Sequence, residues 1–115
     1  MSDIESIDGV LGLNRDETLL AIGARLGSKG MSAQHDREEL VARAKKWMER
    51  NRESLRKAIC SDELVQAARE FPERKRALIL IIADTVSQIH IGVPCFHIAN
   101  LLILDGLDAL CGKLE

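Results

Sequence analysis

The stretch "ALILIIADTVSQIHIGVPCFHIAN", residues 77–100, decides the fold class of this 115-residue chain. Its first seven residues, 77–83, are apolar all round a helix, which is typical of a central helix that other helices surround. They fall far short of the ~20 apolar residues that a membrane-spanning helix needs, so the sequence predicts no span. Gly92 and Pro94 then break the helix, and another apolar helix follows. We therefore expect the buried core of a helical protein here.

The sequence on either side predicts a compact all-α bundle of about five helices. Asn14 or Asp16 can cap the first helix, and Ser32 can cap the second, because their side chains accept hydrogen bonds from free backbone amides. Pro72 is expected to end the third helix and to lie in the first turn of the fourth. The expected helices cover residues 14–26, 31–60, 61–71, 72–91 and 94–115.

Two positions are expected to interrupt these helices. Residues 31–60 form either one long amphipathic helix or two helices that join near Asn51, and the last helix bends at Gly106. Residues 1–12 contain two glycines and scattered acids, which indicates an N-terminal arm or a short turn of helix. Residues 13–115 are expected to form a single all-α domain, because a chain of this length supports one hydrophobic core.

Composition narrows the class of protein. Aromatic residues make up only 3% of the chain, and apolar residues make up 46%, so the core must be aliphatic. Strands draw on aromatic residues, so this composition favours helices. A net charge of -2 argues against a chain that binds a polyanion with its whole surface. The acidic opening "MSDIESIDGV" lacks the basic and apolar regions of a signal peptide, and we expect a cytoplasmic protein.

The three cysteines, Cys60, Cys95 and Cys111, lie far apart in the sequence and form no CxxC pair. An odd number of widely spaced cysteines is not typical of a disulfide framework, and thiols stay reduced in the cytoplasm. The sequence therefore predicts three reduced thiols.

The corner at residues 84–97 holds the candidate metal ligands Asp84, His90, Cys95 and His97. Imidazole, thiolate and carboxylate groups are the ligands that zinc prefers. Their spacing is unlike familiar zinc motifs, and Cys95 and His97 point about 200° apart around a helix. The same geometry argues against a Cys–His nucleophilic pair. We favour the interpretation that these are polar residues at a turn, with Asp84 reaching solvent, and keep soft-metal (zinc) binding as an alternative.

Residues 43–57 form a basic run in which seven cations face Glu49 and Glu53, a net charge of +5. A one-sided basic patch is typical of proteins that bind nucleic acid or another anionic partner. The two glutamates instead favour a solvated helix face on which acidic and basic side chains pair with each other. Trp47, the only aromatic residue in the run, lies on the apolar stripe. The residues proposed for anionic-partner binding are Arg43, Lys46, Arg50, Arg56 and Lys57.

Two segments, residues 12–40 and 69–103, each predict an apolar helix, a short turn and another helix. With "FPERKRAL", a helix ending near "HIG" and "GMS" at 30–32, the chain resembles the TerB-like domains of tellurite resistance. The resemblance implies helix-hairpin repeats, a stress-related role and acidic metal-binding turns. In this chain Ser28 or Lys29 and His90 stand where the turn aspartates are expected. Calcium wants several carboxylate oxygens, so the implied metal site is degenerate.

The sequence predicts a small non-enzymatic interaction or adaptor domain without a cofactor. Its expected partner is another protein or a second copy of the chain, bound through apolar surface such as Phe96 or Leu101. The alternatives are nucleic acid or another anionic partner on residues 43–57, and zinc at the 84–97 corner.

Overall fold

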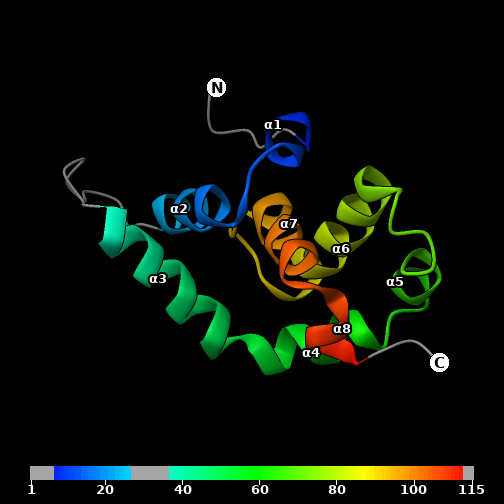
Figure 1. The fold of residues 1–115 in the computed structure, drawn as a ribbon. Coiled ribbons are helices and arrows are strands. Elements are labelled where there is room, and N and C mark those ends of the chain that lie inside the picture. Colours follow the sequence, from blue (N-terminus) through cyan, green and yellow to red (C-terminus); the bar gives the residue numbers. More distant parts are fainter. Residues whose placement is uncertain (1–6, 27–36, 113–115) are drawn as a thin grey trace.

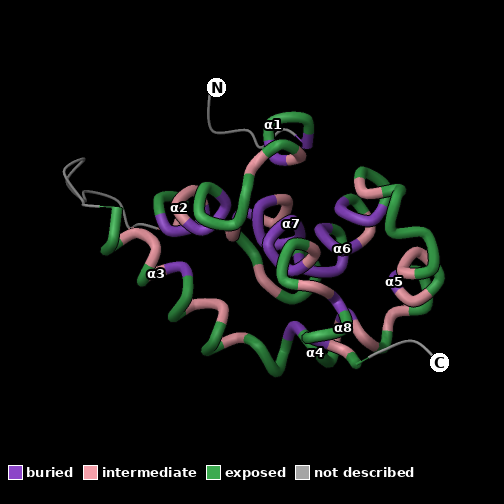
Figure 2. Tube along the Cα trace, in the orientation of Figure 1, coloured by how far each residue is buried: buried purple, intermediate pink, exposed green. Residues whose placement is uncertain are grey.

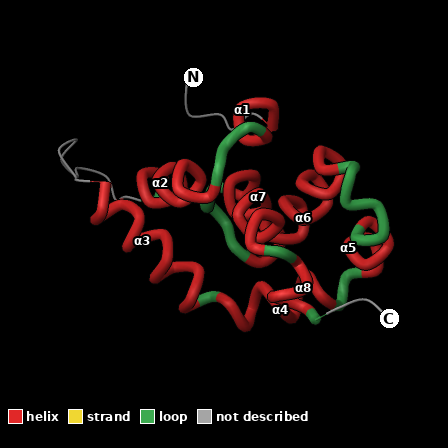
Figure 3. Tube along the Cα trace, in the orientation of Figure 1, coloured by secondary structure: helices red, strands yellow, loops and turns green. Residues whose placement is uncertain are grey.

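The computed structural model describes residues 7–26 and 37–112, and in these ranges the chain is all-α, as predicted (Figures 1 and 3). Eight helices lie in the described ranges, more than the five expected, because short α1 forms at the start and two predicted helices are divided. The helices are α1 Ile7–Leu11, α2 Arg15–Arg25, α3 Arg37–Arg50, α4 Arg52–Cys60, α5 Glu63–Ala68, α6 Lys75–Ile89, α7 Cys95–Asp105 and α8 Leu107–Cys111. None of them combines the length and apolar character that crossing a bilayer requires.

Helices α6 and α7 pack against each other at the centre of the molecule (Figure 1). Figure 2 shows buried positions concentrated on both. Ile79, Ile82 and Val86 of α6 are fully enclosed, since α1, α4, α5 and α7 all contact this helix. Residues 77–83 were expected to be surrounded by other helices. This was wrong for one face of α6, where Ala77 is exposed and Leu80 is 46% exposed.

Side-chain caps set two of the helix starts. Asn14 caps α2: its Oδ1 accepts from the Glu17 amide at 2.8 Å, and Glu17 Oε1 accepts from the Asn14 amide at 2.9 Å. This reciprocal pair is a capping box, and it selects Asn14 over Asp16. At α5, Asp62 Oδ1 accepts from the amides of Leu64 and Val65. The predicted cap at Ser32 lies outside the described residues.

The helix boundary at Pro72 differs from the prediction, and the one at Asn51 agrees with it. Pro72 lies in the turn between α5 and α6, not in the first turn of α6, because the Arg74 amide bonds the Phe71 carbonyl at 2.9 Å and closes a turn first. At Asn51 the chain divides into α3 and α4, which is the second of the two arrangements expected for residues 31–60. Asn51 Nδ2 donates to the Trp47 carbonyl at 2.8 Å, which adds a side-chain donor to the last turn of α3.

Residues 7–11 of the expected N-terminal arm form α1, which packs on α6 and α7. Ile7 and Val10 are buried, and Asp8 pairs with Arg76 of α6. Lys75 Nζ donates to the Leu11 carbonyl at 3.2 Å, so polar contacts reinforce the apolar ones. This part of the chain is therefore attached to the helical body.

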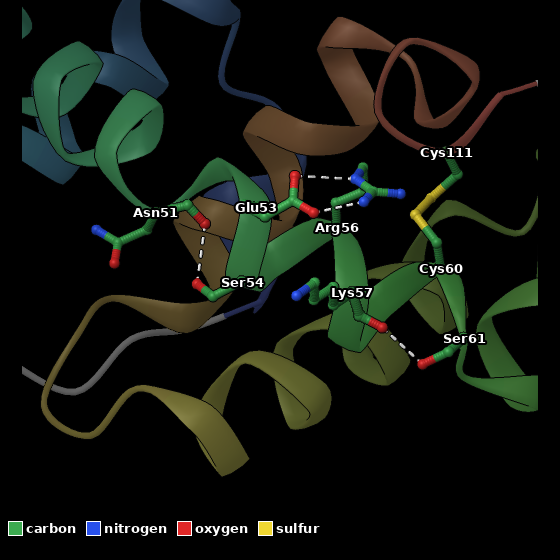
Figure 4. A network of polar contacts seen from close by, with 8 residues as sticks. All are labelled: Asn51, Glu53, Ser54, Arg56, Lys57, Cys60, Ser61 and Cys111. Carbon is green, nitrogen blue, oxygen red and sulfur yellow. Dashed lines mark hydrogen bonds and ion pairs between the residues drawn. A yellow bond between two sulfur atoms is a disulfide. The ribbon is translucent and has the colours of Figure 1, made fainter.

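The prediction of three reduced thiols was wrong, because Cys60 at the end of α4 and Cys111 at the end of α8 form a disulfide (Figure 4). Their Cα atoms lie 5.5 Å apart although 51 positions separate them in sequence. That distance is within the usual range for bridged cysteines. The pairing follows from the packing of α8 on α4, which spacing along the chain does not reveal. Cys95 takes no part in this disulfide.

Candidate binding cleft

His90, one of the proposed metal ligands, packs against the α3–α4 junction. Its ring lies edge-on to Trp47, with centroids 5.1 Å apart, and its Nε2 lies 3.2 Å from Ser54 Oγ. These contacts join the end of α6 to both α3 and α4. The side chain therefore has a clear structural role at this junction.

The other three proposed metal ligands do not assemble around His90. Asp84 is exposed, and its Oδ2 accepts from Gln88 Nε2 at 3.1 Å. Cys95 Sγ lies 3.4 Å from the Val93 carbonyl, and His97 is buried. Within residues 7–26 and 37–112, no three His, Cys, Asp or Glu side chains group closely enough to hold a metal ion. The zinc alternative thus gains no support from this geometry, and elemental analysis of the purified protein remains its test.

The predicted basic face is partly occupied by contacts within the chain. Arg43 Nη1 donates to the Gly23 carbonyl at 3.2 Å, which ties α3 to α2. Arg56 forms a two-point pair with Glu53, at 3.2 Å from Nε and 2.5 Å from Nη2 (Figure 4). The remaining three proposed residues are exposed: Lys46, Arg50 and Lys57. The predicted set is therefore not one uniform cationic surface.

The contact between Arg56 and Glu53 is expected to change how Glu53 titrates. The Arg56 hydrogen bond lowers the pKa of Glu53 below its ordinary value, and the same contact raises the pKa of Arg56. A carboxyl group whose pKa is lower in the folded than in the unfolded chain stabilises the fold at pH values above its unfolded pKa. This contribution is lost as the pH falls through the folded-state pKa of Glu53. We expect Arg56→Gln to return the Glu53 pKa toward its ordinary value in a carboxyl-carbon NMR titration. Arg50→Gln is the control and should leave it in place. An unchanged Glu53 titration in Arg56→Gln would show that the pair is absent in solution.

A cleft of about 430 Å³ lies between α2, the α3–α4 junction, α7 and α8. This volume is within the range of roughly 300–1,000 Å³ that small-molecule binding pockets cover. The apolar lining comes from helices that are distant in sequence: Leu19, Met48, Leu55, Leu101, Leu102 and Leu110. Leu101 was expected to be exposed apolar surface, but it is 1% exposed and lies in this lining; Phe96 is half-buried against the core. The cleft therefore has an aliphatic floor.

Charged side chains surround that floor: Arg15, Lys45, Glu49, Arg52 and Asp105. Arg15 Nε bonds Asp105 Oδ1 at 2.6 Å, and this hydrogen bond raises the pKa of Arg15. Arg52 Nη2 donates to the Ala109 carbonyl at 2.8 Å, so its charge is met by a backbone dipole rather than by a carboxylate. Three cations and two acids leave the rim with an excess of positive charge. The cleft can accept an apolar group that carries an anion at its edge.

The sequence interpretation missed Lys45, Arg52 and Arg15 as a group. Lys45 and Arg52 lie within the basic run. The sequence does not show which cations of this run border the cleft, because that depends on which face of α3 and α4 lies toward α7. Arg15 lies in the first turn of α2 and comes near the others because α2 packs on both α3 and α7. The apolar stripes of residues 14–26 and 31–60 were the only sequence signal for this cleft. Such a stripe shows which face of a helix is buried, but not where the packed helices leave a cleft.

No protein-family model, curated protein or solved structure matches this chain. The resemblance to TerB-like domains stays a prediction.

Proposed function

We propose that this chain is a non-enzymatic interaction domain whose cleft receives apolar side chains from an acidic amphipathic helix of a partner protein. The observation that carries the proposal is the leucine floor bordered by Arg15, Lys45 and Arg52. Burial of aliphatic side chains supplies affinity, and charged groups at the rim select partners of opposite charge. A cytoplasmic location is part of the proposal.

The charge distribution favours an acidic partner over a neutral one. Residues 43–57 carry a net charge of +5, although the whole chain is at -2. The field around α3 and α4 is therefore opposite in sign to that of the remaining chain, and it attracts acidic segments. A helix that docks in a groove presents apolar anchors at positions i, i+3, i+4 and i+7. Leucines at those positions, with glutamates between them, match the floor and the rim.

The test uses a synthetic fluorescein-labelled helical peptide with that pattern and no cysteine. Lys45→Glu is expected to weaken its binding roughly tenfold, about 1.4 kcal/mol, in a fluorescence anisotropy titration. Lys46→Glu is the matched control, since it makes the same charge change one residue away on α3 but outside the cleft. Binding by Lys46→Glu should stay within about twofold of the unaltered chain.

Three results would contradict this assignment. Equal losses in both variants would indicate attraction to the basic run as a whole. A larger loss in Lys46→Glu would favour the exposed residues Lys46, Arg50 and Lys57 as the binding surface. Tighter binding of a single-stranded oligonucleotide, with affinity falling steeply as salt rises, would favour the nucleic-acid alternative.

A further inference from the structure

Helix α8 occupies one end of the cleft and divides it from a second hollow. Ala109 and Leu110 line the cleft, whereas Leu107 and Asp108 line a hollow of about 300 Å³ on the other side. Leu107 and Leu110, three positions apart, are buried in the core, and Asp108 is exposed. This short helix is therefore itself amphipathic and acidic.

Two arginines hold α8 by its acid and its carbonyl groups. Arg52 donates to the Ala109 carbonyl at 2.8 Å. The Arg69 side chain is only 5% exposed, and its Nη2 donates to Asp108 Oδ1 at 2.7 Å and to the Gly112 carbonyl at 2.5 Å. Helix α8 thus turns its leucines toward the core, and its oxygen atoms accept hydrogen bonds from arginines. The proposed partner helix would present the same features. The chain thus already contains one occupant of the kind that the cleft accepts.

We propose that α8 is an internal substitute for the partner helix, locked at one end of the binding surface by the Cys60–Cys111 disulfide and released when that bond is reduced. This inference rests on the proposed function and adds its regulation. Gly106, with φ of +96°, separates α7 from α8, and Gly112, with φ of +88°, follows α8. A side chain would strain both positions, so glycine permits sharp changes of chain direction at the two ends of α8.

Besides the main chain that joins α8 to α7, the disulfide is the covalent link that holds α8 against α4. A helix of five residues is too short to be stable on its own, so α8 depends on its contacts with the body of the protein. After reduction these contacts are non-covalent, and an external helix of the same chemistry can replace them. Displacement of α8 would join the cleft to the second hollow, and a docked helix would have a longer surface to cover.

The redox step needs a thiol reductant. A dithiol transfers two electrons and two protons to the Cys60–Cys111 bond, the S–S bond breaks, each cysteine gains one proton, and the dithiol becomes a disulfide. Dithiol proteins of this kind keep cytoplasmic thiols reduced, and cytoplasmic disulfides are usually transient and often redox-sensing. The lock therefore suits a protein that forms the bond only under oxidising conditions.

The test compares binding of the same cysteine-free acidic peptide to the oxidised chain and to the chain reduced with dithiothreitol. We expect roughly tenfold tighter binding after reduction, a size usual for coupled sites. The Cys60→Ser/Cys111→Ser variant should bind tightly in both conditions. Cys95→Ser, which leaves the disulfide intact, should keep the tenfold difference.

A second readout does not depend on the peptide. Amide hydrogen exchange of residues 107–112 should accelerate on reduction, while the amides of α6 and α7 stay protected. By linkage, saturating peptide should make the disulfide easier to reduce in a glutathione buffer by the same factor as the gain in affinity.

The outcomes separate the two proposals. A peptide that binds neither form would refute the cleft as the docking site, and the exchange rates would still show whether α8 is released. Equal binding to both forms would overturn the lock while leaving the docking site in place. Unchanged exchange at residues 107–112, or general unfolding on reduction seen by circular dichroism, would also overturn the lock.

Discussion

Replacing Gly23 with alanine is expected to lower the free energy of unfolding by about 3 kcal/mol. Gly23 lies where α2 meets α3, and a Cβ atom at this position would overlap the backbone carbonyl of Leu40. The obstacle is main chain, which cannot rotate aside as a flexible side chain can. In an open helix the same change would gain up to about 1 kcal/mol, because alanine has the higher helix propensity. The predicted sign therefore comes entirely from the contact between the two helices.

Urea unfolding followed by circular dichroism at 222 nm measures this effect. Gly12→Ala is the matched control, since nothing lies within 4 Å of an added Cβ there, and it should be neutral or gain up to about 1 kcal/mol. The clash should also separate α3 from α2 and weaken the Arg43 contact with the Gly23 carbonyl. A Gly23→Ala variant as stable as the unaltered chain would show that the two backbones lie further apart in solution.

The Cys60→Ser/Cys111→Ser variant is expected to unfold with a free energy about 2–4 kcal/mol smaller than that of the oxidised chain. The bridge spans 51 positions in the sequence, and a cross-link of this length restricts the unfolded chain strongly. It also joins α8 to α4, so without the bridge α8 depends on its leucines and on the contacts that Arg52 and Arg69 make with it.

Thermal and urea unfolding of the oxidised chain, the double variant and Cys95→Ser measure the loss. Cys95→Ser should change the free energy of unfolding less than the double variant, because this half-buried thiol is not cross-linked. Alkylation of the unreduced, unfolded protein should modify one cysteine per chain. If all three cysteines react, the bond is absent from the purified protein and the two stabilities should agree.

The fold class was predictable because its signals are local. The apolar run of α6, the Asn14 cap, and the breaks at Asn51 and Gly106 act through neighbouring residues. The candidate site was less predictable. The basic run lies on α3 and α4, which border the cleft, but the five residues predicted from it include Arg43 and Arg56, which bond to Gly23 and Glu53. Leu101 was assigned to the surface, yet it lies in the floor of the cleft.

The sequence by itself determined that this protein is helical, aliphatic in its core and divided by particular glycine, proline and asparagine residues. Helix propensity, capping and hydrophobic period operate over three or four residues, so a single chain reveals them directly. Only the tertiary structure decided that Cys60 bonds to Cys111 and that the backbone at Leu40 packs closely against Gly23. The same holds for the position of α8 at one end of a leucine-lined cleft. These contacts join positions distant along the chain, and they depend on how whole helices pack.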